Sequence, residues 1–210
     1  VEGDSTNIKI FDNTIIGRHN PDLPLPPGES TNYWLEGEGI IISGENNIIA
    51  HNTISNTADA ISISGRNNDV YANYIFNNTD DGVELDWGYA NIRVWGNKIE
   101  NTGAYAFSFQ PMYSGPWYFI RNVAYGTESK LKFLGEISRF ALFHNTFIVR
   151  EVGGRPFIPT SYASLHGGWG QSILRGTLKN NLFIYNSKDA NRYVWYAWKG
   201  DPDSSKYISQ

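Results

Sequence analysis

The sequence predicts an all-β solenoid, in which the chain winds into stacked coils of short strands. A pattern of about 23 residues recurs around an asparagine, and within each copy apolar and polar residues alternate as they do in strands. The composition agrees, because 21 Gly, 13 Tyr and 7 Trp with only 18% charged residues are typical of a turn-rich all-β protein. The copies are centred on Asn13, Asn52, Asn73, Asn97, Asn122, Asn145 and Asn181.

Each copy contains two short strands separated by a bend, most clearly in residues 47–56, 69–77 and 91–101. From Asn52 to Asn145 the centres lie 21, 24, 25 and 23 residues apart, which is too short for a two-helix repeat and fits one turn of three strands. We therefore predict a right-handed parallel β-helix of about seven coils. Asparagine suits the bend because it tolerates left-handed backbone and bonds neighbouring main-chain groups, so stacked coils are expected to form an asparagine ladder.

The repeat runs through nearly the whole chain, which predicts a single β-helix domain over residues 1–210. The spacing widens to 39 residues between Asn13 and Asn52 and to 36 between Asn145 and Asn181. These gaps predict loop excursions at about 17–35 and 151–161, both marked by proline and glycine. Because the first coil begins close to Val1, a second interpretation is that the chain is part of a longer protein.

The charge and composition bear on partners and location. A net charge of −4 argues against nucleic acid, which requires a basic surface, and no stretch is apolar enough to cross a membrane. The absence of cysteine fits an exported protein. We expect an extracellular or periplasmic protein whose signal peptide is absent from this chain, and the sequence leaves the oligomeric state open.

A polar outer face is predicted on the strand that precedes each asparagine-centred pair, in residues 60–64, 82–86, 106–110 and 130–134. If the apolar residues point inward, a period of two sends the alternate residues outward. These are Ser62, Ser64, Glu84, Asp86, Ser108, Gln110, Lys130 and Lys132.

Acidic residues gather where these strands begin. Asp59, then Asp80 and Asp81, and then Tyr105 hold equivalent positions in successive coils, which lie about 4.8 Å apart. Asp59, Asp81 and Glu84 should therefore share one small patch, where mutual repulsion requires a proton or a cation. Carboxylate ligands without a cysteine or histidine cluster favour Ca²⁺. The alternative is a solvated turn whose aspartates cap the local backbone.

A catalytic arrangement follows if the patch holds a cation. Lys132 lies two coils from Glu84, about 10 Å by the same spacing, which leaves room for a sugar carboxylate between the metal and the amine. This arrangement suits β-elimination on an acidic polysaccharide, pectate-like or alginate-like, with Lys132 or Lys130 as the base. The flat rings of Trp87 and Tyr105 are candidates for stacking on the sugar, and Arg121 and Arg139 for pairing with its carboxylates.

The run Asn78-Thr79-Asp80-Asp81-Gly82-Val83-Glu84-Leu85 resembles the aspartate motif of the lysine-dependent pectate lyases of polysaccharide lyase family nine. That family consists of right-handed parallel β-helices that use Ca²⁺ and a lysine base. The resemblance implies that the metal ligands here are Asp59, Asp80, Asp81 and Glu84. Glu84 stands where that family has Asp, and the candidate lysines lie two coils further on.

The same segment also resembles the polygalacturonase-type glycoside hydrolases of family twenty-eight. Asn56-Thr57-Ala58-Asp59 carries an inserted Ala relative to that family's Asn-Thr-Asp run, and the pair Asp80 and Asp81 fits its aspartate pair. Lys130-Leu131-Lys132 stands where that family has Arg-Ile-Lys, and Tyr105 replaces its histidine. An inverting hydrolase is therefore a second functional hypothesis. A third is a non-catalytic glycan-binding or structural β-helix, such as an adhesin or phage fibre, because the scaffold alone implies no enzyme.

Overall fold

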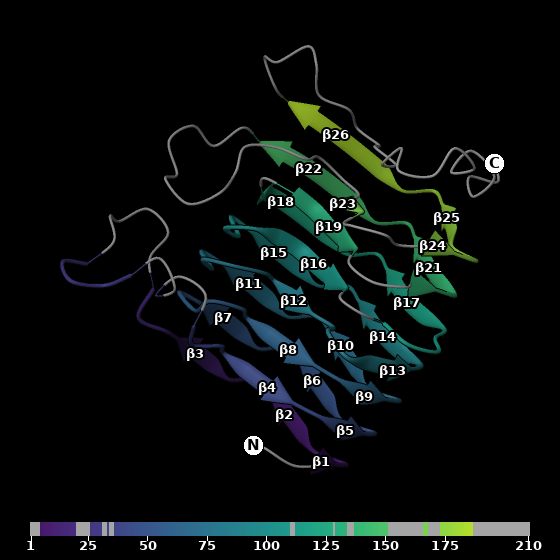
Figure 1. The fold of residues 1–210 in the computed structure, drawn as a ribbon, viewed down its shortest axis with the longest axis horizontal. Coiled ribbons are helices and arrows are strands. Elements are labelled where there is room, and N and C mark those ends of the chain that lie inside the picture. The colour runs from purple at the N-terminus through teal and green to yellow at the C-terminus, as the bar shows by residue number, and fades with distance from the viewer. Residues whose placement is uncertain are drawn as a thin grey trace.

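The computed structural model describes residues 5–19, 26–30, 33, 36–109, 112–127, 129–133, 137–150, 166–167 and 173–186. Every strand pair among these residues is parallel, and each strand pairs with its equivalent about one repeat away. Strands distant in the sequence therefore stack side by side from one end of the molecule to the other (Figure 1). The predicted all-β parallel β-helix is confirmed.

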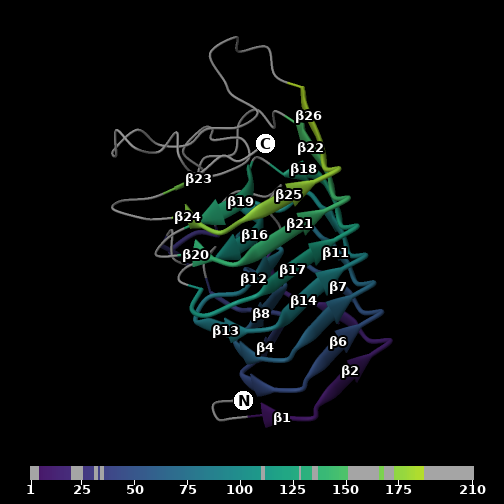
Figure 2. The same cartoon turned by 90° about the vertical axis from the view of Figure 1, so that its right-hand side faces the viewer.

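Four sheets form the wall, and a two-stranded sheet, sheet E, adds to it (Figure 2). Sheet A contains β1 (Ser5–Thr6), β5 (Gly44–Glu45), β9 (Gly65–Arg66) and β13 (Gly88–Ala90). Sheet B contains β2 (Lys9–Phe11), β6 (Ile48–Ala50), β10 (Asp69–Tyr71), β14 (Ile92–Trp95), β17 (Trp117–Ile120), β21 (Phe140–Phe143) and β25 (Thr177–Lys179). Sheet C contains β3 (Thr14–Ile16), β7 (Thr53–Ser55), β11 (Tyr74–Phe76), β15 (Lys98–Glu100), β18 (Val123–Thr127), β22 (Thr146–Arg150) and β26 (Leu182–Asn186). Sheet D contains β4 (Ile40–Ile42), β8 (Ile61–Ile63), β12 (Val83–Glu84), β16 (Tyr105–Phe109), β19 (Ser129–Phe133) and β23 (His166–Gly167), and sheet E pairs β20 (Ile137–Ser138) with β24 (Ile173–Leu174).

One turn of the helix passes through the sheets in the order D, A, B and C, as β4 to β7 show. The sequence predicts three strands per turn, but a short strand in sheet A makes a fourth. Sheet A spans only four turns, whereas sheets B and C extend over seven strands each. Counted by the strands of sheet A, the described residues form about four turns, fewer than the seven coils predicted, and the further strands of sheets B and C belong to turns that have no strand in sheet A.

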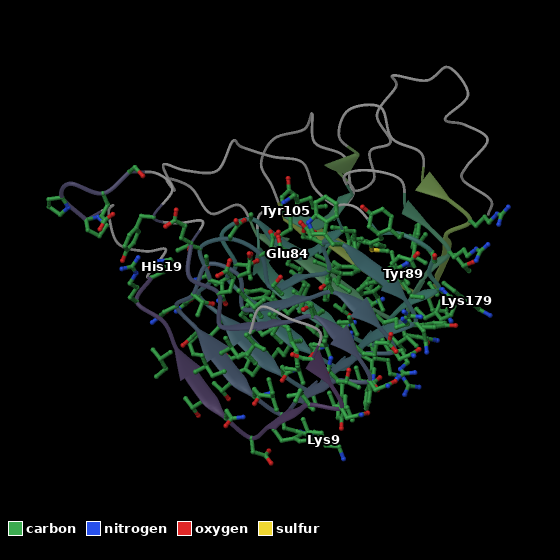
Figure 3. The ribbon with its side chains drawn as sticks, turned by 60° about the horizontal axis from the view of Figure 1, so that its bottom comes forward. Lys9, His19, Glu84, Tyr89, Tyr105 and Lys179 are labelled. Carbon is green, nitrogen blue, oxygen red and sulfur yellow. The ribbon has the colours of Figure 1, made fainter. Side chains whose placement is uncertain are left out.

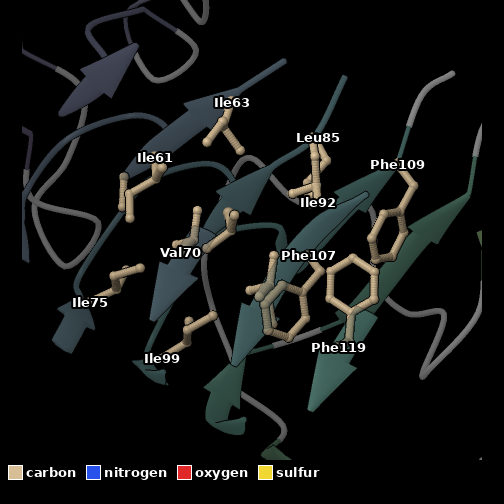
Figure 4. Packing of buried hydrophobic residues seen from close by; sticks show 14 of the residues in the cluster. Ile61, Ile63, Val70, Ile75, Leu85, Ile92, Ile99, Phe107, Phe109 and Phe119 are labelled. Carbon is tan, nitrogen blue, oxygen red and sulfur yellow. The ribbon is translucent and has the colours of Figure 1, made fainter. Parts of the chain in front are cut away.

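The core is a column of apolar side chains inside the coils. On sheet D the inward positions fall in one row, in which Ile40, Ile61, Val83, Phe107 and Leu131 are register partners and all are buried. In the middle of the column the ring centroids of Phe107 and Phe109 lie 5.6 Å and 4.7 Å from that of Phe119, edge to face (Figure 4). Removing this apolar surface from water is the main force that holds the coils together.

The predicted asparagine ladder is present at the bend between sheets B and C. Within it, the Asn73 backbone N–H and side-chain Nδ2 both donate to Oδ1 of Asn97 at 3.0 Å, and Asn97 repeats both bonds to Asn122. Each Nδ2 also donates to a wall carbonyl, as Asn97 does to Val70 at 2.9 Å. All seven predicted asparagines take part: Asn13, Asn52, Asn73, Asn97, Asn122, Asn145 and Asn181.

We expected asparagine at this bend because it tolerates left-handed backbone, but the ladder asparagine is not the residue with left-handed backbone. The residue immediately before it takes positive φ in every coil: Asp12, His51, Ala72, Gly96, Arg121, His144 and Asn180. The ladder position therefore selects asparagine for its donor and acceptor pair and not for its backbone freedom. A second, shorter ladder, which the sequence did not predict, joins Asn47 and Asn68 between sheets A and B.

The loop excursion at 151–161 lies outside the described residues, and the one at 17–35 is described only in part. At the start of the first excursion, the His19 N–H donates a hydrogen bond to the Asn56 carbonyl in the wall of the β-helix at 2.8 Å. The described part of the chain contains no helical segment with the length and apolarity that a bilayer crossing requires.

We expect Asn97→Ala to lower the free energy of unfolding by about 3 kcal/mol, because it removes the oxygen that accepts from the Asn73 N–H and Nδ2 and the amide that donates to the Val70 carbonyl inside the wall. Urea denaturation followed by circular dichroism measures the loss. Lys98→Ala, at the next position but with a half-exposed side chain, is the control and should change stability by less than about 1 kcal/mol. Equal effects of the two substitutions would contradict the role assigned to the ladder.

Candidate functional site

The outward row of sheet D carries the polar residues that the alternation predicts. Ser62, Glu84, Ser108 and Lys132 are successive register partners, one from each of β8, β12, β16 and β19. Glu84 Oε2 accepts a hydrogen bond from the Ser62 hydroxyl at 3.0 Å, and the Ser108 hydroxyl lies 3.2 Å from Asp86 Oδ1. The parallel register therefore brings side chains from four consecutive coils into one line.

Asp59 and Asp81 form a ladder of their own where the strands of sheet D begin. The Asp81 N–H donates to Asp59 Oδ1 at 2.8 Å, and the Tyr105 N–H donates to Asp81 Oδ1 at 2.9 Å. Both aspartates are almost completely buried. The alternative that these aspartates cap the backbone is thus partly correct, because one oxygen of each carboxylate accepts a hydrogen bond from the backbone of the next coil.

That structural role does not require a charge. Asparagine accepts the equivalent backbone hydrogen bond throughout the ladder between sheets B and C, without burying a carboxylate. Aspartate at positions 59 and 81 adds a desolvated negative charge in each coil, and the two charges repel. The backbone hydrogen bonds of this ladder therefore do not by themselves account for aspartate in place of asparagine.

The three carboxylates that the sequence places together do meet. Asp59, Asp81 and Glu84 each offer an oxygen within 4.8 Å of the others. Asp81 Oδ2 is buried and has no hydrogen-bond partner among the described residues. Figure 3 shows Glu84 beside Tyr105 on one face of the molecule, with His19 and Tyr89 on either side. We refer to Asp59, Asp81 and Glu84 as the acidic cluster.

Asp80, the fourth predicted ligand, is adjacent in sequence to the cluster but is not one of the three residues whose oxygens converge. Burial raises the pKa of Asp80 to about 8, with a further contribution from Asp81 and an opposing one from Lys132. Burial also raises the pKa of Asp59, and the charges of Asp81, Asp80 and Glu84 raise it further. Burial raises the pKa of Asp81 too, against the ammonium of Lys132 and the hydrogen bond from Tyr105.

Lys132 lies closer to the acids than the sequence predicts. Its Nζ is 3.6 Å from Asp81 Oδ2, so the side chain reaches back over one coil and no gap remains for a sugar carboxylate. The same Nζ lies 5.6 Å from the ring centroid of Tyr105. The spacing of coils predicted the row of Lys132 correctly but could not predict the direction of a flexible side chain.

The protonation of Lys132 follows from this contact. Burial lowers the pKa of Lys132, but the carboxylates of Asp81, Asp80 and Asp86 outweigh burial and raise it overall. Burial, with Asp81, also raises the pKa of Tyr105 to about 12. In the protein without a bound cation, Lys132 is therefore an ammonium that partly neutralises the cluster.

The donor set fits a hard divalent cation. All three groups offer carboxylate oxygens, which Ca²⁺ and Mg²⁺ prefer, and Asp81 Oδ2 is a buried oxygen that accepts no hydrogen bond. A cation bound there would compete with Lys132 for that oxygen.

The remaining predicted residues are spread over the molecule. Tyr105 begins β16 next to the cluster, and Trp87 follows β12 with 64% of its surface exposed. Arg121 lies in the bend between sheets B and C, and Arg139 lies between β20 and β21, so neither is on sheet D. Lys130 belongs to β19, but its side chain is outside the described part of the structure.

His19 is a neighbour of the site that sequence reasoning missed. Its Nδ1 lies 3.2 Å from the hydroxyl of Thr79, the residue before Asp80, and its ring centroid lies 4.6 Å from that of Tyr33. Burial, and then the charge of Arg18, lower the pKa of His19. No sequence pattern indicates this contact, because His19 belongs to an excursion that does not follow the repeat.

No protein-family model matches the sequence, and no curated protein matches it. One solved structure that is similar to this chain is a mutant of DFA-IIIase from Arthrobacter chlorophenolicus A6 in complex with DFA-III. The similarity covers 92% of this chain and 58% of that one, with 11% sequence identity and a TM-score of 0.48. The chain thus spans less than two thirds of that protein's length. The class of this protein, a parallel β-helix, follows from its own strand pairing.

We expect the metal-free protein to lose stability as the pH rises from about 4 to about 8. The pKa of Asp80 is about 8 in the folded state and near 4 when unfolded, so the folded state binds more protons across this interval and stability falls. Thermal unfolding in a chelator should show a Tm lower by roughly 5 °C or more at pH 8 than at pH 5.

Asp80→Asn should reduce this dependence but not abolish it, because the pKa values of Asp59 and Asp81 are also raised. Asp69→Asn, an Asp-to-Asn change on sheet B, should leave the dependence in place. A Tm in chelator that stays constant or rises between pH 5 and pH 8 would show that folding does not raise the pKa values of these aspartates.

We expect Ca²⁺ to bind the acidic cluster and Asp81→Asn to weaken that binding at least about tenfold, because it removes a charged ligand but keeps the acceptor for the Tyr105 N–H. Isothermal titration calorimetry at pH 8 measures the affinity. Asp69→Asn is again the control. The prediction of a cation at this site would be wrong if the wild-type protein gave no heat of binding, or if Asp81→Asn left the affinity unchanged.

Proposed function

We propose that this β-helix binds an acidic polysaccharide across sheet D and cleaves it by β-elimination with the help of Ca²⁺. The observation that carries the proposal is the buried Asp81 Oδ2, which accepts no hydrogen bond, lies within the acidic cluster and faces Lys132 at 3.6 Å. Carboxylates, a hard-cation donor set and an amine are the groups that elimination on a uronate sugar requires. We further propose that the protein acts outside the cell or in the periplasm, where such polymers occur.

The acidic cluster would hold the cation, with Asp80 as a neighbouring acid. When bound, Ca²⁺ would neutralise the carboxylate of the uronate and so acidify the hydrogen on C5. Lys132 is the proposed base, and it accepts the C5 proton on Nζ. The electron pair of the C–H bond becomes the C4–C5 double bond, and the oxygen on C4 leaves with its sugar and takes a proton from water.

Lys132 can act as a base only when it is neutral. The carboxylates of Asp81, Asp80 and Asp86 raise its pKa, so their charge must be neutralised before the amine loses its proton. Activity that depends on a cation and increases toward alkaline pH is the consequence. Tyr105, with its ring near Lys132 and a pKa of about 12, stays a neutral phenol throughout this range.

An inverting hydrolase remains the second candidate, and the pKa of Asp80 is the observation that favours it. A carboxyl group with a pKa of about 8 is protonated at neutral pH, as a general acid must be. The packing of the cluster counts against an acid–base pair drawn from Asp59, Asp81 and Glu84, because inversion needs carboxyl groups about 6.5–9.5 Å apart, whereas the oxygens of these three residues converge within 4.8 Å.

The test is incubation with polygalacturonate and with alginate, each with Ca²⁺ or with chelator. We expect ultraviolet-absorbing unsaturated ends that form only with Ca²⁺, and Lys132→Ala should lower kcat by about 100-fold or more while Ca²⁺ still binds. Lys98→Ala, a lysine on sheet C, is the control.

If saturated reducing ends form in chelator, the protein is a hydrolase and not a lyase. No cleavage of either polymer, with binding retained, would favour the non-catalytic glycan-binding protein. Full activity in Lys132→Ala would exclude this lysine as the base.

A further inference from the structure

The segment after β12 contains a backbone feature that a stable fold does not need. Trp87 has a φ of 61°, in the left-handed region, which is strained for a bulky side chain. Its indole is nevertheless 64% exposed, so the strain is not compensated by burial. Elsewhere among the described residues asparagine or glycine fills most such positions, and Trp87 has the largest side chain of the residues that take positive φ, which also include histidines and arginines. A strained and exposed tryptophan points to a function for its ring.

Tyr89, two residues later, is presented by a second irregularity. The pairing of β13 with β9 shifts register between Gly88 and Ala90, so that Tyr89 is an extra residue and its side chain is 52% exposed. Such bulges re-aim side chains. Gly88 is required between the two rings, because a Cβ there would lie 2.2 Å from the indole of the buried Trp117.

Tyr113, from the next coil, completes the group. Its N–H donates to the Gly88 carbonyl at 3.0 Å, and its side chain is 44% exposed. The ring centroid of Tyr113 lies 6.2 Å from that of Trp87 and 6.0 Å from that of Tyr89, with interplanar angles of 41° and 47°. We refer to Trp87, Tyr89 and Tyr113 as the aromatic platform.

Charged groups lie at the edge of the platform. The guanidinium of Arg66 lies 6.0 Å from the ring centroid of Tyr89 and pairs with Glu45 at 2.7 Å. Exposed aromatic rings beside an ion pair offer a stacking surface together with hydrogen-bonding partners. This combination suits a sugar ring, which has an apolar C–H face and a rim of hydroxyl groups.

The platform adjoins the strands that contribute residues to the acidic cluster and its surroundings. Glu84 and Trp87 lie three residues apart in the same coil, and Tyr113 follows β16, the strand that contains Tyr105 and Ser108. We propose that the aromatic platform is a binding subsite for a sugar unit of the acidic polysaccharide, outside the unit that is cleaved. It would extend the bound polymer from sheet D onto sheet A, and this inference rests on the proposed function.

Binding without cleavage tests the subsite separately from the chemistry. Isothermal titration calorimetry with oligogalacturonates and with alginate oligomers, in chelator, measures affinity when the cation is absent. We expect Trp87→Ala and Tyr113→Ala each to weaken binding of long oligomers about tenfold, the scale of one aromatic contact, and to affect the shortest oligomers much less. Trp95→Ala is the matched control, because Trp95 is also exposed but is stacked on Tyr71 on sheet B.

Wild-type affinity in both platform variants would overturn the subsite even if the protein proves to be a lyase. No binding of either oligomer by the wild-type protein would overturn it as well. Conversely, weakened binding in the platform variants, together with a protein that cleaves neither polymer, would support the subsite and leave the elimination chemistry as the part that fails.

Discussion

The structure depends on hydrogen bonds between a side-chain oxygen in one coil and a backbone N–H in the next. Such bonds fix the register of the coils at three bends of the wall, in the two asparagine ladders and in the aspartate ladder. In the asparagine ladder the earlier coil donates, as the Asn73 N–H does to Asn97, whereas in the aspartate ladder the later coil donates, as the Asp81 N–H does to Asp59. A slip of one residue would turn the apolar row of sheet D outward, so a fixed register is what brings residues such as Glu84 and Lys132 into one line.

The aspartate ladder links the fold to the site, because the same carboxylates serve both. Asp59 and Asp81 each use Oδ1 for the wall, so their positions are set before any ligand binds. Their remaining charge is costly, and three agents could neutralise it: a proton, the ammonium of Lys132 or a cation. Without a cation, the raised pKa values of the aspartates favour a bound proton, and the raised pKa of Lys132 keeps its ammonium charged. A cation would release Lys132 from its present role, which is why we connect metal binding with the basicity of this amine.

The sequence predicted the features that follow from the regular repeat of about 23 residues. Repetition and alternation were enough to identify the parallel β-helix, the asparagine ladder and the meeting of Asp59, Asp81 and Glu84, because in a solenoid the sequence separation of about one repeat becomes physical proximity. They could not predict the side chain of Lys132, whose long stem turns toward Asp81, or the short strands of sheet A. His19 was missed because contacts made by an excursion have no period.

The wall and the outer face have separate tasks, and this separation explains where the irregular features lie. At the bend between sheets B and C, a left-handed residue in each coil is tolerated because the ladder asparagine beside it holds the backbone. After β12 no ladder accompanies the left-handed Trp87, and the bulge at Tyr89 interrupts the pairing of sheet A. Selection for stability alone would favour glycine or asparagine at the left-handed position of Trp87. Both irregularities expose aromatic rings beside the strand that contributes Glu84, so the departures from the repeat gather next to the acidic cluster, as expected if this face binds the ligand.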